Sequence, residues 1–166
     1  MNPVARPIPA ALLALALSVS LSAPALASGR AEVRWAEPSH FTDAGFGARE
    51  IERTQRVLGA HIERLAERLP DGQVLAVEVR DVDLAGELEM FTADQLRVLG
   101  RAPDRPRLDL RFELRAGGEV LRHGEAVLTD LAYLDRGVGL RRGEPLEHER
   151  RLLDRWFDEQ IISAGQ

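Results

Sequence analysis

The chain has 166 residues, with 22 basic side chains, all of them arginine, and 27 acidic ones, which gives a formal net charge of −5. An acidic balance favours solubility and argues against a general nucleic-acid-binding protein. Because the sequence contains no cysteine, it excludes disulfides, thiol nucleophiles and thiolate metal sites, so its stability must come from packing.

The first 27 residues have the pattern of a signal peptide. Arg6 supplies a short positive region, residues 10–21 form a mainly apolar run, and Ala25-Leu26-Ala27 offers the small residues after which a signal peptidase cuts. We therefore predict a cleaved signal peptide over residues 1–27 and a periplasmic or secreted protein.

A retained membrane anchor is the alternative to cleavage. A membrane-spanning helix needs about 20 apolar residues, whereas Ser22 and Pro24 close this run. We therefore predict that the mature chain, residues 28–166, is a single domain that does not span the membrane after cleavage.

The first strand is predicted over residues 31–36, where apolar and polar side chains alternate. Pro38 ends it, because the proline ring has no N–H to donate to a sheet ladder. Apolar side chains at helical spacing then predict a helix over residues 48–69. The Pro-Asp-Gly sequence at 70–72 ends that helix.

Two further strands are predicted in the middle of the chain. Residues 73–80 carry apolar side chains on both faces, which favours a central position in the sheet. Residues 107–115 alternate between apolar and charged side chains, which predicts a strand with one solvent-exposed face. Between them the pattern is weak, and Thr92 as an N-cap predicts a short helix over 93–99.

A hairpin follows the strand at 107–115. Gly117 and Gly118 predict a two-residue turn, because both can take positive φ, and the next strand is predicted over 119–129. This turn would pair Leu114 with Leu121.

The same register, continued, would place Glu125 on the apolar face of the hairpin. A bulge restores the pattern, and Gly124 is the residue at which we predict it. The bulge then brings Ala126 and Leu128 inward.

Pro145 begins the final predicted helix, and the order of elements is β-α-β-β-β-α. The first two strands flank a helix and are expected to be parallel, whereas the last two form an antiparallel hairpin. We predict an α+β fold, a two-layer sandwich in which two helices cover one face of a mixed sheet of about four strands.

Three aspartates are the candidate ligand or metal cluster. Asp81 and Asp83 lie at the carboxyl end of a predicted strand, and Asp130 follows the last strand and joins them if the strand ends coincide. Close carboxylates can bind a divalent cation or act as a general acid. The alternative is structural: the aspartates accept hydrogen bonds from backbone amides in turns.

Other catalytic signatures are missing from the sequence. The four histidines are scattered without metal-ligand spacing, no Gly-x-Ser-x-Gly elbow occurs, and no phosphate-binding glycine loop is present. His61, on the edge of the first helix's apolar stripe, is expected in a boundary position. No cofactor is predicted.

One segment is rich in arginine, from Arg97 to Arg115. It is interpreted either as a contact for anionic lipid or polysaccharide, or as a solvated strand face with weak ion pairs, because Asp109 and Glu113 alternate with its arginines.

Several short motifs, taken in order, resemble a bacterial family of exported proteins catalogued as domain of unknown function 3016. The resemblance covers nearly all of the mature chain and implies an exported single domain, with no known activity, cofactor or catalytic residue. The motifs are Val33-Arg34-Trp35 with Pro38 and Phe41-Thr42-Asp43, the segment 79–87, Leu108-Asp109-Leu110-Arg111, the segment 128–134, Glu144-Pro145-Leu146, and the segment 153–157.

The sequence therefore favours a non-enzymatic periplasmic binding or accessory domain of the bacterial envelope. Its partner would be an unidentified envelope protein or a small ligand and not nucleic acid, and its oligomeric state is left open. The alternative is a carboxylate-based hydrolase or a divalent-metal-binding enzyme that uses Asp81, Asp83 and Asp130.

Overall fold

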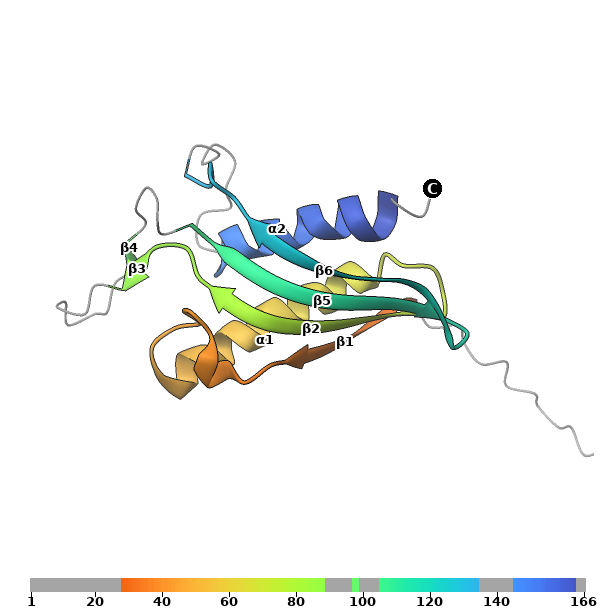
Figure 1. Ribbon diagram of the computed structural model, residues 1–166, viewed down its shortest axis with the longest axis horizontal. Coiled ribbons are helices and arrows are strands. Elements are labelled where there is room, and N and C mark those ends of the chain that lie inside the picture. Colours follow the sequence, from red (N-terminus) through yellow and green to blue (C-terminus); the bar gives the residue numbers. More distant parts are fainter. Residues whose placement is uncertain (1–27, 89–96, 99–104, 135–144, 164–166) are drawn as a thin grey trace, which may run out of the picture.

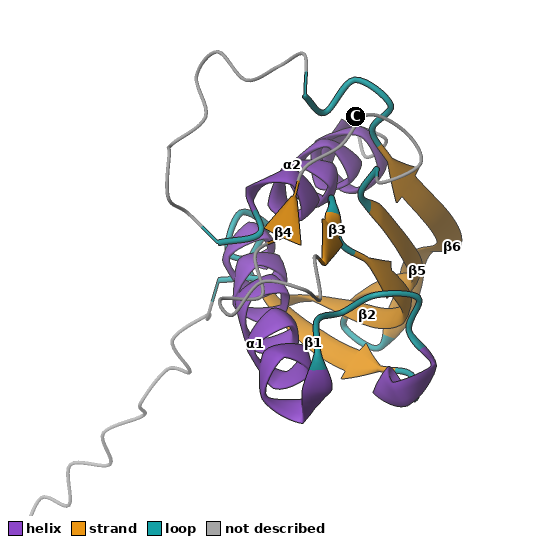
Figure 2. Cartoon of the chain, turned by 90° about the vertical axis from the view of Figure 1, so that its left-hand side faces the viewer, coloured by secondary structure: helices purple, strands orange, loops and turns teal. Residues whose placement is uncertain are grey.

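The computed structural model describes residues 28–88, 97–98, 105–134 and 145–163, and these residues form a two-layer α+β sandwich (Figure 1). One layer is a sheet and the other consists of helices (Figure 2). The elements are β1 (Arg30–Trp35), η1 (Pro38–His40), α1 (Gly47–Ala66), β2 (Gln73–Asp83), β3 (Glu87–Leu88), β4 (Arg97–Val98), β5 (Arg107–Ala116), β6 (Glu119–Thr129), α2 (Glu147–Trp156) and η2, a π-helical continuation of α2 (Phe157–Ile162).

The main sheet has four strands in the order β1-β2-β5-β6. β1 is parallel to β2, with α1 as the connection, while β2 pairs antiparallel with β5 and β5 with β6. This confirms the predicted mixed sheet and the antiparallel hairpin. Within the described part of the chain, none of the helices has the length and apolar character that crossing a bilayer requires.

β3 and β4 form a separate two-stranded antiparallel sheet, in which Leu88 is opposite Arg97. The helix predicted over 93–99 is therefore wrong at residues 97–98, while 93–96 and 99 lie outside the described residues. A helix this short is marginal from local propensity alone, and hydrogen bonding to a second strand satisfies the backbone instead.

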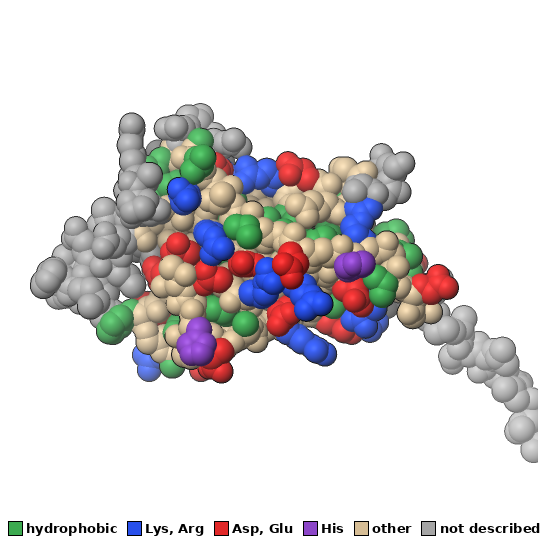
Figure 3. Space-filling model, viewed as in Figure 1, with side chains coloured by type: hydrophobic (Ala, Val, Ile, Leu, Met, Phe, Trp, Pro, Cys, Tyr) green, Lys and Arg blue, Asp and Glu red, His purple; other side chains and the backbone are tan. Residues whose placement is uncertain are grey.

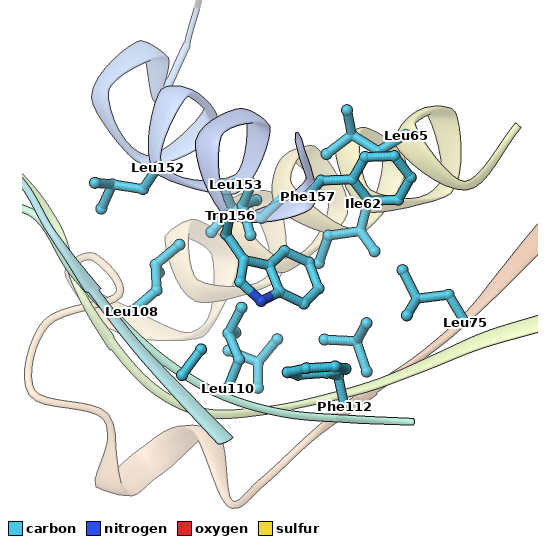
Figure 4. Packing of buried hydrophobic residues seen from close by; sticks show 14 of the residues in the cluster. Ile62, Leu65, Leu75, Leu108, Leu110, Phe112, Leu152, Leu153, Trp156 and Phe157 are labelled. Atoms are coloured by element: carbon cyan, nitrogen blue, oxygen red, sulfur yellow. The ribbon is translucent and has the colours of Figure 1, made fainter. Parts of the chain in front are cut away.

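The hydrophobic core lies between the helices and one face of the sheet (Figure 4). Alternation along β5 directs Leu110 and Phe112 into it. From α2, Trp156 is fully buried and meets the Phe112 ring edge-on, with 5.5 Å between ring centroids. Burying a side chain of this kind stabilises the fold by about 1.5–3 kcal/mol, so α2 is held to the sheet mainly by apolar contact.

The hairpin has the predicted turn but a different register. Gly117 and Gly118 both have positive φ, as expected. The sheet pairs Leu114 with Arg122, so the predicted Leu114–Leu121 pair is wrong, and the register shift lies beside Leu121.

Gly124 is not the bulge that the sequence predicted. It lies opposite Phe112 in the ladder, and a Cβ atom added to it would be 3.1 Å from that ring. The glycine therefore makes room for the aromatic ring. Beyond it, Ala126 pairs with Leu110 and Leu128 with Leu108, so both residues face inward as predicted.

Candidate functional site: the open face of the sheet

The second face of the main sheet is not covered by either helix, and we call it the open face (Figure 2). Acidic and basic side chains are interspersed over its strands (Figure 3). This follows from the period of two along a strand, because each residue between two core residues points the other way. The charged residues at these positions are Glu32, Arg34, Glu78, Asp81, Asp83, Arg107, Asp109, Arg111, Glu113, Arg115 and Glu125, with Arg80 beside them at a bulge.

Cross-strand register arranges these charges in rows. One row contains Arg34 on β1, Glu78 on β2, Arg111 on β5 and Glu125 on β6. Neighbouring positions in a row are about 4.8 Å apart, so positive and negative side chains alternate across the whole sheet.

A groove of about 490 Å³ lies on this face and crosses all four strands. Its volume falls within the range of small-molecule sites, about 300–1,000 Å³. Both signs of charge contribute to its walls. The lining residues are Glu32, Arg34, Ala76, Val77, Glu78, Arg111, Phe112, Glu113, Arg115, His123, Gly124 and Glu125.

Arg80 forms the tightest ion-pair network of the open face. Its Nε and Nη2 atoms donate to Asp109 Oδ1 at 2.9 and 2.7 Å, and its Nη1 atom donates to Glu125 Oε1 at 2.8 Å. These two carboxylates, Asp109 first, raise the pKa of Arg80 above its ordinary value. The register shift between Val79 and Asp81 places Arg80 at this bulge, from which it reaches across β5 to β6.

Arg34 and Arg111 differ from the arginines around them. Arg80, Arg107 and Arg115 each pair with a carboxylate of the open face. Among the residues that the structure describes, the side chains of Arg34 and Arg111 form no ion pair or hydrogen bond, although both line the groove. Their guanidinium groups therefore keep their donors available.

Asp81 holds a loop against the sheet. Its Oδ1 atom accepts the backbone N–H of Thr42 at 2.8 Å, and Oδ2 accepts the Thr42 hydroxyl at 2.9 Å and Arg107 Nη1 at 2.7 Å. Three hydrogen bonds to one carboxylate, one of them from a guanidinium, fix the position of that side chain. They match the structural alternative for Asp81, although only the Thr42 amide is a backbone donor and the other two donors are side chains, of Thr42 and of Arg107 on the adjacent strand β5.

The other two aspartates of the predicted cluster point in different directions. Asp83 is opposite Arg107, which is opposite Thr129, so the strand ends coincide as the sequence reasoning required. Asp130, however, is buried; its Oδ1 atom accepts the Ala132 N–H at 2.9 Å, and its Oδ2 atom lies 3.8 Å from Arg155 Nη1 of α2.

The contact with α2 places the Asp130 side chain on the helix side of the sheet, away from the open face. Within the described ranges, no three His, Cys, Asp or Glu side chains are grouped so that they could hold a metal ion. The structure therefore does not assemble Asp81, Asp83 and Asp130 as a ligand set.

His61 is buried at the interface between α1 and α2. Its Nε2 atom lies 2.7 Å from Asp154 Oδ1, and Arg150 Nε donates to its Nδ1 atom at 3.3 Å. Because arginine only donates, Nδ1 is the acceptor and Nε2 carries the hydrogen toward Asp154. The boundary position expected for His61 thus becomes a polar link between the two helices.

Glu149 is a structural carboxylate that sequence reasoning missed. It is 2 % exposed, and its Oε1 atom accepts the N–H of Ala85 at 2.7 Å, which ties α2 to the end of β2. The available signal is its spacing: Glu149 precedes Leu152, Leu153 and Trp156 along the same buried stripe of α2.

Within β5, most arginines of the arginine-rich segment form ion pairs on the open face. Arg107 donates to Asp81, and Arg115 Nη2 lies 3.2 Å from Glu32 Oε2. Only Arg111 of that strand is left without such a partner among the described residues. Its β5 part therefore contributes one available guanidinium to the groove, while Arg101 and the side chain of Arg97 lie outside the described residues.

Comparison with known proteins finds a family for this chain. The family model described as protein of unknown function (DUF3016) matches residues 29–159. No curated protein and no solved structure matches the chain. The match agrees with the resemblance found in the sequence motifs, and it brings no activity, ligand or site residue with it.

Proposed function

We propose that this chain, which belongs to the DUF3016 family, is a non-enzymatic binding or accessory domain of the bacterial envelope that holds a partner on its open face. The observation that carries the proposal is the pair Arg34 and Arg111, which line the groove without a carboxylate partner among the described residues. Each guanidinium offers five N–H donors in a planar arrangement that suits carboxylate groups.

The charges of the groove define the class of partner. Glu78 lies between the two available arginines in their row, and Glu32, Glu113 and Glu125 also line the groove. These acids would repel a polyanion, whereas a partner with both carboxylate and cationic groups can satisfy both signs. A peptide segment of an envelope protein has this chemistry, and we take it as the partner class.

The N-terminal sequence supports the envelope location. Residues 1–27 have the charge, apolar run and small residues of a cleaved signal peptide, and the family match begins at residue 29. Mass spectrometry of the purified protein should find Ser28 as the first residue, in a soluble envelope fraction. An intact Met1 terminus in the cytoplasm would contradict export.

Capture from envelope extract tests the binding surface. The full chain is expressed with a C-terminal tag, and the wild type is compared with the double variant Arg34→Glu, Arg111→Glu. The matched control is Arg49→Glu, Arg56→Glu, which changes the net charge equally at exposed positions of α1.

The expected result is that the wild type and the α1 control retain the same envelope protein, while the groove variant loses it. Binding should also weaken as the salt concentration rises from about 0.05 to 0.5 M, because salt screens the attraction between exposed charges. Equal capture by all three proteins would show that the open face is not the binding surface.

A further inference from the structure

β6 is an edge strand: no strand of the described residues pairs with its outer side. It spans Glu119–Thr129, and its ladder partner in the described sheet is β5 alone. An edge strand presents a row of N–H and C=O groups that can pair with another chain. Proteins usually protect such edges with proline, with charges, with bulges or with short strands. β6 has eleven residues and no proline, and its charged side chains and the bulge beside Leu121 leave Val120, Leu121 and Val127 exposed.

Exposed apolar side chains lie near both ends of β6. Val120 and Leu121 are each 51 % exposed and Val127 is 57 % exposed, which makes them three of the five large hydrophobic residues that are exposed in the described chain. Gly124 lies midway between Leu121 and Val127. The edge thus has an apolar residue three positions before the glycine and another three positions after it.

The polar side chains beside Gly124 follow the same symmetry. His123 precedes Gly124 and Glu125 follows it, and both are exposed. If two copies of β6 pair antiparallel with Gly124 opposite Gly124, each His123 is opposite a Glu125 and each Leu121 is opposite a Val127. Cross-strand pairs of complementary polar side chains and of apolar side chains both stabilise a sheet.

Other registers lose this complementarity. A shift by one residue moves side chains to the opposite face of the sheet, and a shift by two places Leu121 opposite Glu125. The pattern therefore favours a second copy of this chain over an unrelated strand, because an unrelated strand has no reason to match a sequence that is symmetric about its own centre.

We propose that two copies associate through β6 in an antiparallel pair centred on Gly124, which joins the two sheets into one of eight strands. Such an interface is isologous and closes after two copies. A two-fold axis perpendicular to the sheet keeps both open faces on the same side. His123 and Glu125 line the groove at its β6 end, so the two grooves would meet at the interface.

Cysteine cross-linking tests the register directly, since the chain has no cysteine of its own. In the double variant Leu121→Cys, Val127→Cys, the proposed pair places each introduced thiol opposite the other type on the second copy, within disulfide reach. Residues six positions apart on one strand are about 20 Å apart, so the two thiols of one chain cannot join each other.

The expected result is a reducible covalent dimer of the double variant after mild oxidation. The single variants Leu121→Cys and Val127→Cys are matched controls. In this register, the introduced cysteine of one copy is about 20 Å from the same cysteine of the second copy. Efficient cross-linking of either single variant, or none of the double variant, would overturn the proposed pairing.

The mass of the uncross-linked protein gives a second, independent test. We expect the full chain, expressed and purified at micromolar concentration, to have the mass of a dimer by light scattering. His123→Glu should raise the dimer dissociation constant by at least tenfold, because it places two pairs of like charges across the interface. His123→Gln should have a smaller effect, and circular dichroism should show both variants folded.

A wild type that is monomeric at several hundred micromolar would refute the dimer. Its refutation leaves the proposed function intact, since capture by Arg34 and Arg111 does not depend on a second copy.

Discussion

The two faces of the sheet are formed by the same strands, but one is apolar and buried and the other is charged and exposed. Along β5, Leu110 and Phe112 enter the core, while Asp109 and Arg111, which alternate with them in sequence, point to the open face. Contact with the helices removes the apolar side chains of the covered face from water, and this burial is the main favourable term in folding. The open face offers exposed ion pairs, which contribute about 0–1 kcal/mol each. Stability and the proposed binding would therefore depend on opposite faces of the same strand.

The largest effect should come from the covered face. Trp156→Ala removes a fully buried indole that packs on Phe112, and we expect the free energy of unfolding to fall by about 3–5 kcal/mol. Urea denaturation measures this, with the exposed Glu159→Ala on the same helical segment as control. Nearly equal stabilities would mean that α2 is not docked on the sheet.

A smaller loss is expected where β6 passes beneath the Phe112 ring. Gly124→Val would place side-chain atoms against that ring, since even a Cβ atom would be 3.1 Å away. We expect a cost of about 1–3 kcal/mol from overpacking. Phe112→Leu in the same chain should recover part of it, so a double-mutant cycle in urea should show coupling; additive effects would exclude this contact as the cause.

Asp81 lies on the open face but has a structural role, which sharpens the distinction between the faces. Asp81→Ala leaves the Thr42 amide without its acceptor, and we expect a loss of about 1–3 kcal/mol. Millimolar calcium or magnesium should leave the wild-type melting curve unchanged. A melting shift of several degrees with either ion, abolished by Asp83→Asn, would instead support the carboxylate or metal-enzyme alternative.

The smallest change in stability should accompany the largest change in binding. Arg111→Ala removes an exposed side chain that has no ion pair among the described residues, so unfolding should change by at most about 0.5 kcal/mol. Retention of the envelope partner, measured by the same capture assay, should nevertheless fall. If stability falls and capture persists, the two faces do not divide these roles.

The fold was accessible from the sequence because its elements leave local periodic signals. The alternation at 107–115 and the helical stripe of α1 each reflect which side of one element is buried. The pairing register was not accessible, because it depends on the fit of the Phe112 ring over Gly124. That contact is between residues of two strands, so the sequence of the turn alone does not predict it.

The candidate site shows the same limit. The strand ends next to Asp83 and Asp130 do coincide, which was the condition for the cluster, but Asp130 faces Arg155 of α2 on the helix side. The groove depends on which arginines lack a partner, and the alternation of β5 alone does not distinguish Arg111 from its paired neighbours Arg107 and Arg115. The direction of a side chain and its ion-pair partner both depend on the tertiary structure.

The parallel pairing of β1 with β2 has a consequence for the order of folding. Arg30 meets Val74 only after α1 has been formed and folded back, whereas β5 and β6 are joined by a turn of two glycines. Closing a long loop costs more chain entropy than closing a short one, so the hairpin should form first and the N-terminal strand should add last. Pulse-labelled hydrogen exchange would then find amides of β5 and β6 protected before those of β1, and the first strand of the domain to be synthesised would be the last to become ordered.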